Sequence, residues 1–167
     1  RRQATLVSDE QLLRVIARQA RRLGMRIAPA VRQCRDIAVP AVLGVVKPVI
    51  LLPASLCTQL TSEQIELLLA HELAHIRRQD YLTNLLQSLA ENLLFFHPAV
   101  WWISARIRST REEACDDLAA MAIGEPRRLA LALVELDRFQ FPEPAPRLAL
   151  GAHQGDLMTR ITRLLHP

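Results

Sequence analysis

The chain has 167 residues, of which 50% are apolar and 23% are charged, and its net charge is +4. This length and apolar content allow one domain with a substantial core and exclude an intrinsically disordered chain. The arginines that carry the positive charge are scattered along the sequence and only 4% of residues are aromatic, so no nucleic-acid partner is expected.

The N-terminal third of the chain predicts a helix followed by short strands. Apolar residues from Leu12 to Leu23 recur at helical spacing, and Gly24 ends the helix. Residues 26–53 are β-branched and interrupted by proline and glycine, which predicts two or three strands, the last over residues 48–52. Because prolines in sheets occur mainly on edge strands, we expect residues 48–52 to form an exposed edge.

The remaining two thirds of the chain predict helices. Thr61 and Gln64 form a capping box for a helix that continues to about Gln79, and Asp80 is expected to cap the next helix. Pro98 suits the first turn of a third helix. The predicted helices span residues 61–79, 81–96, 98–123, 127–138 and 156–165, with a loop rich in proline and glycine over residues 139–155.

These elements predict an α+β fold that is mainly helical, with a small, partly antiparallel sheet. We expect one domain over residues 1–138, and over residues 139–167 a loop and a basic helix that packs on this domain or leads away from it. The apolar stretches are too interrupted by charges and prolines to span a membrane, so this piece of chain is expected to be soluble. Trp101 and Trp102 must point to different sides of their helix, so we expect one in the core and the other facing lipid or a membrane helix.

The stretch HELAH, residues 71–75, is the strongest functional signal. Residues four apart lie one above the other on a helix, so His71 and His75 can present imidazole nitrogens to one zinc ion. Glu72 lies about 100° around the helix, where its carboxylate can act on water as a general base. Apolar residues surround the three, and buried histidines without partners are unfavourable. The pattern predicts a zinc site in which Glu72 is catalytic.

A third zinc ligand is expected in the stretch REEACDD, residues 111–117. Small and apolar residues spaced by threes and fours form a seam on this predicted helix, and Glu112 is the carboxylate within the seam. Asp116, one turn later, can accept a hydrogen bond from a zinc-bound histidine. Glu113 and Asp117 have the same spacing on the neighbouring, more polar face, so the pattern favours Glu112 without excluding Glu113.

Three further residues, Tyr81, His97 and His153, are candidates for contacting substrate or stabilising an oxyanion. Each also has a structural interpretation, which the sequence favours. Tyr81 would pack at a helix junction, His97 would start a helix or lie in the core, and His153 would be exposed in the predicted loop. Asp80 is likewise interpreted as a helix cap rather than as a neighbour of the metal.

The stretches HELAHIRRQD, FFHPAVWW and REEACDD, in this order and preceded by PVILLP, resemble the BlaR/MecR-type antirepressor zinc metallopeptidases, membrane-embedded sensor-transducers of the gluzincin group. The resemblance covers about residues 37–122. It implies a zincin-like protease domain with zinc ligands His71, His75 and Glu112, and with Glu72 catalytic. It also implies a place at the cytoplasmic face of the cell membrane, beside the transmembrane helices of a parent protein. The implied substrates are a repressor-like cytosolic regulator and the chain itself.

The sequence therefore predicts a zinc endopeptidase that binds an extended protein substrate along the edge at residues 48–52. The loop over residues 141–155 is a candidate for self-cleavage or for covering the zinc cleft, although a passive linker is favoured. Two alternatives stay open. A deformylase-like hydrolase shares HExxH but needs a cysteine ligand, for which Cys57 and Cys115 are the candidates. A non-catalytic, zinc-stabilised scaffold would instead dock on membrane helices or nucleic acid.

Overall fold

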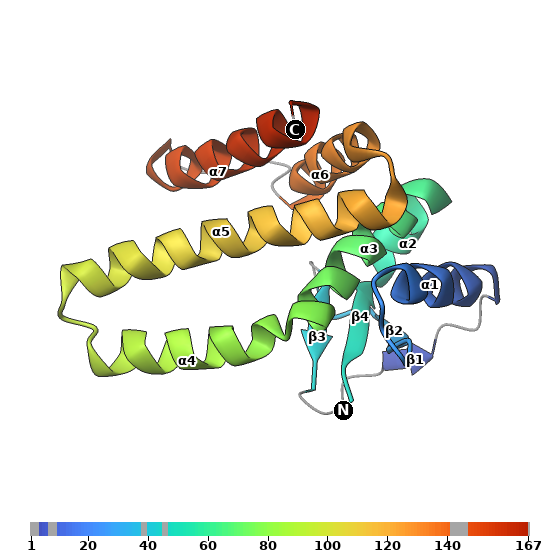
Figure 1. Cartoon of the computed structure of the whole chain (residues 1–167), viewed down its shortest axis with the longest axis horizontal. Helices are drawn as coiled ribbons and strands as arrows, with labels where there is room; N and C mark the ends of the chain where they lie inside the picture. The colour runs from blue at the N-terminus through green and yellow to red at the C-terminus, as the bar shows by residue number, and fades with distance from the viewer. Residues whose placement is uncertain (1–3, 7–9, 38–39, 45–46, 141–146, 167) are drawn as a thin grey trace.

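A computed structural model of the chain describes residues 4–6, 10–37, 40–44, 47–140 and 147–166. As predicted, the architecture is α+β and mainly helical, with a small sheet ahead of the helix that carries HELAH (Figure 1). The strands are β1 (Ala4–Leu6), β2 (Ala30–Cys34), β3 (Ala41–Leu43) and β4 (Val49–Pro53). The helices are α1 (Glu10–Arg22), α2 (Ala54–Gln59), α3 (Ser62–Arg78), α4 (Asp80–Leu93), α5 (Pro98–Ile123), α6 (Pro126–Gln140) and α7 (Arg147–Leu165).

The described strands form one mixed sheet in the order β1-β2-β4-β3. β2 and β4 are parallel, whereas β1 with β2 and β3 with β4 are antiparallel. The expectation that residues 48–52 form an exposed edge is wrong, because β4 lies between β2 and β3 and pairs with both. Pro48 precedes β4 and Pro53 is its last residue, so neither proline removes a donor from the middle of the strand. The edge strand on this side is β3.

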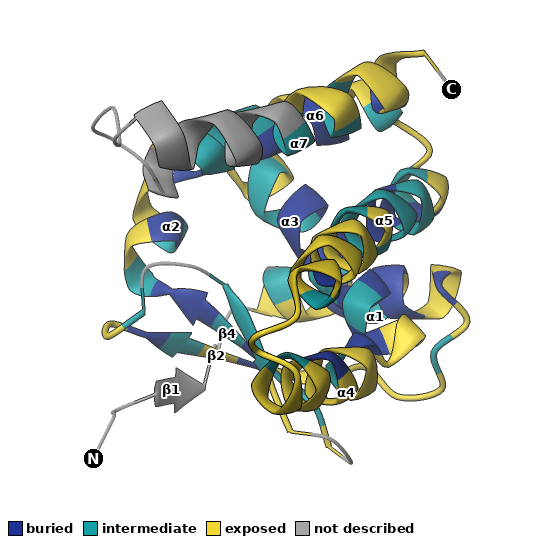
Figure 2. Ribbon diagram, turned by 90° about the vertical axis from the view of Figure 1, so that its left-hand side faces the viewer, coloured by how far each residue is buried: buried dark blue, intermediate teal, exposed yellow. Residues whose placement is uncertain are grey.

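The helix α3 packs on several sides because most of its residues from Leu67 to Ile76 are apolar and buried. α1, α5 and α6 all contact it, and Figure 2 shows it enclosed among them. Leu69 and Leu73 belong to a buried cluster that also holds Ile50 of β4. Burying one leucine side chain stabilises the fold by about 2 kcal/mol, so this cluster fixes the position of the HELAH side chains.

The ends of α3 and α5 form as the sequence predicts. At the start of α3, the Thr61 hydroxyl accepts a hydrogen bond from the Gln64 amide, and the Gln64 side chain accepts one from the Thr61 amide. At the start of α5, the His97 ring accepts a hydrogen bond from the Ala99 amide. α5 ends at Gly124, whose φ of 79° lies in the left-handed region that glycine adopts most readily.

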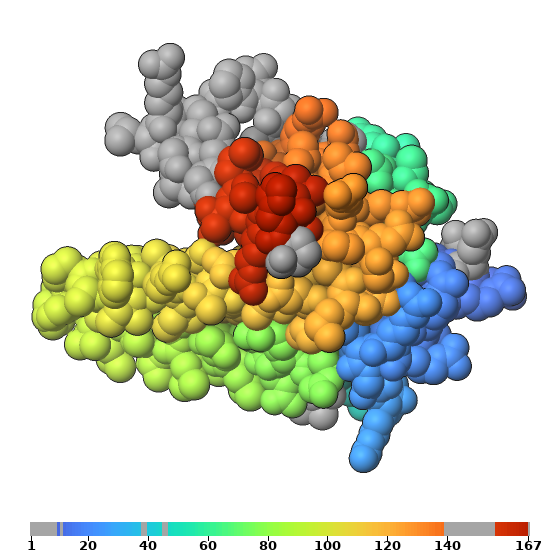
Figure 3. Space-filling view, turned by 45° about the horizontal axis from the view of Figure 1, so that its top comes forward, coloured from blue at the N-terminus to red at the C-terminus, as the bar shows by residue number. Residues whose placement is uncertain are grey.

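The C-terminal portion differs from the predicted loop and short helix. The backbone is helical up to Gln140 and again from Arg147 to Leu165, so the loop expected over residues 139–155 is wrong for residues 139–140 and 147–155, while residues 141–146 lie outside the described residues. Each glycine inside a helix costs about 1 kcal/mol relative to alanine, but Leu157, Ile161 and Leu164 pack against α6 and supply compensating burial. α7 also lies against α5 (Figure 3). The domain boundary at residue 138 stays a prediction.

The helix α4 and the first half of α5 form an antiparallel hairpin that projects from the rest of the molecule (Figure 1). Most of its surface is exposed (Figure 2). The expectation that either Trp101 or Trp102 lies in the core is wrong, because both side chains are exposed. This part of α5 packs against α4, and neither tryptophan belongs to a buried apolar cluster of the described residues. Within the described parts of the chain, no helix has the length and apolar content needed to cross a bilayer.

Candidate metal centre

The two histidines of HELAH point to the same place. His71 and His75 lie one turn apart on α3, and their Nε2 atoms are 3.1 Å apart. Their ring planes are nearly perpendicular, with centroids separated by 4.8 Å. His71 is buried, and His75 retains a fifth of its side-chain exposure. The helix spacing therefore brings both nitrogens to one point at the edge of the core, as expected.

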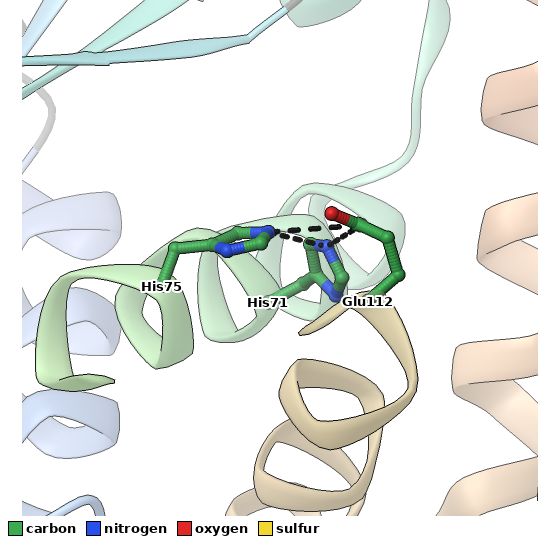
Figure 4. A group of neighbouring side chains, drawn as sticks. All are labelled: His71, His75 and Glu112. Atoms are coloured by element: carbon green, nitrogen blue, oxygen red, sulfur yellow. Dashed lines mark hydrogen bonds and ion pairs between the residues drawn. The ribbon is translucent and has the colours of Figure 1, made fainter. Parts of the chain in front are cut away.

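The carboxylate of Glu112 joins them from α5 (Figure 4). Its Oε2 lies 3.4 Å from His71 Nε2 and 3.7 Å from His75 Nε2. The three ligand atoms all lie within 4.8 Å of one another. α5 approaches α3 closely because the neighbouring positions on this face, Cys115 and Ala119, are small and completely buried.

The alternative carboxylates on α5 face away from the histidines. Glu113 accepts a hydrogen bond from Arg163 Nη1 at 2.7 Å, and Asp117 accepts one from the same guanidinium. Both side chains thus bond to α7 across the polar face of α5. Of the two faces that the sequence left open, the structure brings the one with Glu112 to His71 and His75.

A buried aspartate contacts the Nδ1 atom of His71, on the side of the ring away from the candidate metal position. Asp116 Oδ1 lies 2.9 Å from His71 Nδ1, on the opposite side of the ring from Glu112. Arg160 of α7 holds Asp116 in turn, because its Nε and Nη2 donate to the two carboxylate oxygens at 2.6 and 2.9 Å. A carboxylate at Nδ1 fixes the tautomer of an imidazole and leaves the Nε2 lone pair for a metal. Asp116 is thus the carboxylate beside Nδ1 of His71, and its effect on a bound metal stays a prediction.

Asp80 supports His75 in the same way, and the expected capping role is wrong. Gln79 adopts a left-handed φ of 58°, ends α3 and turns the chain directly into α4, so that Asp80 becomes the first residue of α4 and is buried. Asp80 Oδ2 lies 2.8 Å from His75 Nδ1. A signal for this role was present in the sequence, since an acidic residue follows directly after the helix that carries both histidines.

Cys115 lies on the Nδ1 side of His75, away from Glu112. Its Sγ is 3.2 Å from His75 Nδ1 and donates to Asp80 Oδ2 at 3.1 Å. His75, Asp80 and Cys115 form a second compact group of potential ligands. Their polar atoms already contact one another, however, and these contacts support the His75 ring. Cys57 belongs to neither group among the described residues. The position that a deformylase-like site would give to cysteine is occupied here by Glu112.

The electrostatics of the site favour a cation. Burial lowers the pKa of His75, but hydrogen bonds with Asp80, Cys115 and Glu112 outweigh this effect and raise the pKa to about 12. Burial raises the pKa of the Glu112 carboxyl, but hydrogen bonds with the two histidines outweigh it and hold this pKa well below its usual range. The carboxylates of Asp80 and Glu112 thus stabilise positive charge on the His75 ring, and Arg160 Nη1 also lies 3.7 Å from Glu112 Oε2. Two imidazoles and one carboxylate are also a ligand set that zinc prefers, so a zinc ion fits these residues.

A cleft of about 1150 Å³ opens beside the three ligands. Glu72 and Tyr81 line it, together with residues 40–42 of the β3 segment. Burial raises the pKa of the Glu72 carboxyl above its ordinary value. His97 does not belong to this lining: it caps α5 at the far end of the hairpin. The side chain of His153 lies outside the described part of the chain, although its backbone belongs to α7.

Replacement of Asp80 by asparagine is expected to weaken zinc binding by about 10–100-fold, the usual effect of removing a carboxylate that orients a ligating histidine. The amide can present its NH₂ group to His75 and no longer selects the tautomer that leaves Nε2 unprotonated. The measurement is the zinc Kd, obtained by competition with a chelating dye. Asp117→Asn is the matched control, because Asp117 bonds to Arg163 on the outer face of α5. Equal affinities for the two variants would contradict the supporting role of Asp80.

Comparison with known proteins identifies the family of the chain. A family model described as BlaR1 peptidase M56 matches residues 1–162. Regulatory protein BlaR1 of Bacillus licheniformis is 32% identical over 77 residues, and the methicillin resistance mecR1 protein of Staphylococcus aureus is 30% identical over 77 residues. Each of these matches covers 46% of this chain and 13% of the relative, so the chain spans only a small part of the length of these proteins. The match over nearly the whole chain shows that it belongs to the BlaR1 peptidase family M56.

Proposed function

We propose that the chain is a zinc-dependent endopeptidase and forms the protease portion of a membrane sensor-transducer. The observation that carries this proposal is the convergence of His71, His75 and Glu112 within 4.8 Å, at the wall of a cleft that Glu72 also lines. Membership of a peptidase family supports it.

His71, His75 and Glu112 would hold the zinc ion, and Asp116 and Asp80 would orient the two imidazoles. When bound, zinc supplies a Lewis acid that polarises a peptide carbonyl and makes water more acidic. Three protein ligands leave a fourth coordination position free for chemistry. A structural zinc site, in contrast, is usually closed by four protein ligands, so the number of converging donors favours catalysis over a purely structural role.

Glu72 would act as the general base and then as the general acid. Its carboxylate accepts a proton from the attacking water and returns it to the leaving amine nitrogen. Burial raises the pKa of this carboxyl toward the pH at which it works, which favours both transfers. Tyr81, which lines the same cleft, is a candidate for donating a hydrogen bond to the developing oxyanion.

The substrate would bind as an extended strand along β3. Its segment lines the cleft at Pro40, Ala41 and Val42, and β3 is the edge strand next to β4. An edge strand offers unpaired backbone groups to an extended peptide, whatever the sequence of that peptide. We infer that this substrate is a repressor-like cytosolic regulator, and that the chain itself is a second substrate. The parent protein would hold the domain beside its transmembrane helices, at the cytoplasmic face of the membrane.

Metal removal tests this function. Treatment with a zinc chelator is expected to abolish hydrolysis of a peptide library, and one equivalent of zinc per chain to restore it. Zinc at a hundred times its Kd should also raise the free energy of unfolding by about 2.7 kcal/mol, which is read as a higher Tm. A rise in Tm without any hydrolysis would favour the zinc-stabilised scaffold. Hydrolysis that survives complete metal removal would contradict both proposals.

A further inference from the structure

The hairpin of α4 and the first half of α5 shows an apolar surface to solvent. Five leucines on α4 have between 42% and 67% of their surface exposed. They are Leu82, Leu85, Leu86, Leu89 and Leu93. The connection and α5 add further exposed apolar side chains, namely Leu94, Phe95, Phe96, Trp101, Trp102, Ile103 and Ile107. So many exposed large apolar side chains on one hairpin of a globular domain mark an interaction site.

The contacts between the two helices of the hairpin include buried polar groups, although its outer surface is apolar. Gln87 Nε2 donates to the Ser104 carbonyl at 3.0 Å and to Glu91 Oε1 at 3.2 Å, and Arg108 Nη1 donates to the same Glu91 oxygen at 2.7 Å. Gln87 and Ser104 are buried. On α4, the leucines recur at helical spacing on the face opposite Gln87 and Glu91. Water favours the reverse arrangement, with leucines inside and amides outside.

The tip of the hairpin is uncharged and aromatic. Residues 92–105 contain no Asp, Glu, Lys or Arg. Phe95, Phe96, Trp101 and Trp102 are four of the seven aromatic residues of the chain, which has four Phe, two Trp and one Tyr. The Trp101 indole donates to the Phe95 carbonyl at 2.8 Å, so the tip is held in shape with its side chains outward. Tryptophan is the residue most typical of the boundary between lipid and water.

Arginines follow directly below the apolar tip. Arg106 and Arg108 are exposed on α5 one to two turns before Glu112. Glu91 is the only acidic residue between Tyr81 and Ser109, and its charge is paired with Arg108. The order of an uncharged tip followed by arginines matches the order of groups in a bilayer. The tip would meet the acyl chains, and the arginines would meet the anionic lipid phosphates outside them.

We propose that the α4–α5 hairpin inserts its tip into one leaflet of a lipid bilayer, to the depth of the headgroup and upper acyl region. α4 has 14 residues and is about 20 Å long, which suits insertion into one leaflet. Here exposed apolar side chains lie on the outward face of α4, on α5 at Trp102, Ile103 and Ile107, and on the tip between the two helices. A bilayer can solvate all of them at once.

This placement puts the cleft close to the bilayer surface. The cleft lining includes Trp102 and Ala105 of the tip and the two arginines that follow it, Arg106 and Arg108. Insertion of the tip would therefore present the cleft to polypeptide that lies near the membrane. The inference concerns the hairpin alone and requires neither bound metal nor peptidase activity, so it can fail or hold independently of the proposed function.

Vesicle binding followed by tryptophan fluorescence tests the proposal. Trp101 and Trp102 are the only tryptophans, so the intrinsic signal reports on the hairpin alone. With vesicles of phosphatidylcholine, and more strongly with added phosphatidylglycerol, the emission should shift to shorter wavelength, and lipids brominated in the upper acyl chain should quench it. The double variant Leu86→Glu, Leu93→Glu should bind at least about tenfold more weakly, because two charged side chains would enter the apolar region.

The matched control carries the same substitutions elsewhere. Met121 and Leu131 are at least as exposed as Leu86 and Leu93, at 79% and 67%, but lie on the other half of α5 and on α6. Met121→Glu, Leu131→Glu should bind vesicles like the unchanged chain. Absence of vesicle binding would overturn the proposal, and would point to protein helices or a second copy of the chain as the occupant. Binding only to phosphatidylglycerol vesicles, with Leu86→Glu, Leu93→Glu unaffected, would also overturn it by showing surface attraction without insertion.

Discussion

Replacement of Glu72 by glutamine is expected to abolish peptide hydrolysis while one zinc ion stays bound per chain. Glutamine has nearly the same shape as glutamate but cannot accept a proton, and the loss of a general base typically lowers a rate by about 10²–10⁴-fold. Glu72 is not among the three donors that converge on the candidate metal position, so its removal leaves the ligands in place. Turnover of a defined peptide and the zinc content of the same preparation are the two measurements.

Glu63→Gln provides the control for this substitution. Glu63 lies near the start of the same helix, α3, with 75% of its side chain exposed, and it is not part of the cleft lining. This variant should hydrolyse peptides and bind zinc like the unchanged chain. Hydrolysis by Glu72→Gln at the unchanged rate would remove Glu72 from the mechanism. Loss of zinc from this variant would instead place Glu72 among the ligands.

The second large effect is expected at Glu112. Glu112→Ala should weaken zinc binding by at least about a hundredfold, more than the loss of a residue that only orients a ligand, because two imidazoles alone would hold the ion. Glu113→Ala should leave the zinc Kd unchanged, since this carboxylate bonds to Arg163 on α7. Both variants remove one carboxylate from adjacent positions of α5, and they are compared by competition with a chelating dye.

Stability measurements separate loss of a ligand from loss of the fold. Without zinc, both variants are expected to lower the Tm, because Glu113 bonds to Arg163 of α7, and Glu112 lies 3.7 Å from Arg160 of α7 and beside both histidines. With zinc added, only Glu113→Ala should regain stability as the unchanged chain does. The opposite ranking of the two zinc affinities would move the metal site to the other face of α5 and would contradict the proposed ligand set.

Local patterns predicted the helix that carries the candidate site. The spacing of His71 and His75 depends only on the geometry of an α-helix, and the capping box at Thr61 depends on residues three apart. The preference for Glu112 used the seam of small residues on α5, which is also a local pattern. Each of these features is decided within a few turns of one helix, which explains why the sequence alone was enough to predict them.

Features that depend on distant parts of the chain were predicted less well. The order of strands in the sheet decides which strand is an edge, and the presence of proline near residues 48–52 did not reveal that β4 pairs on both sides. The glycines and prolines before residue 156 suggested a loop, but the backbone is helical over residues 147–155, which begin the helix whose later residues Leu157, Ile161 and Leu164 pack against α6. In both cases the energy of long-range pairing or packing outweighs the local preference.

The sequence by itself determined which residues are candidate metal ligands and on which helices they lie, because helical periodicity fixes the side of a helix to which each side chain points. Only the tertiary structure decided which residues contact the Nδ1 atoms of the two histidines. The left-handed turn at Gln79 buries Asp80 against His75, and the packing of α7 brings Arg160 to Asp116. Such contacts join residues whose helices meet only after folding. Burial makes their hydrogen bonds and charges strong enough to orient the two imidazoles.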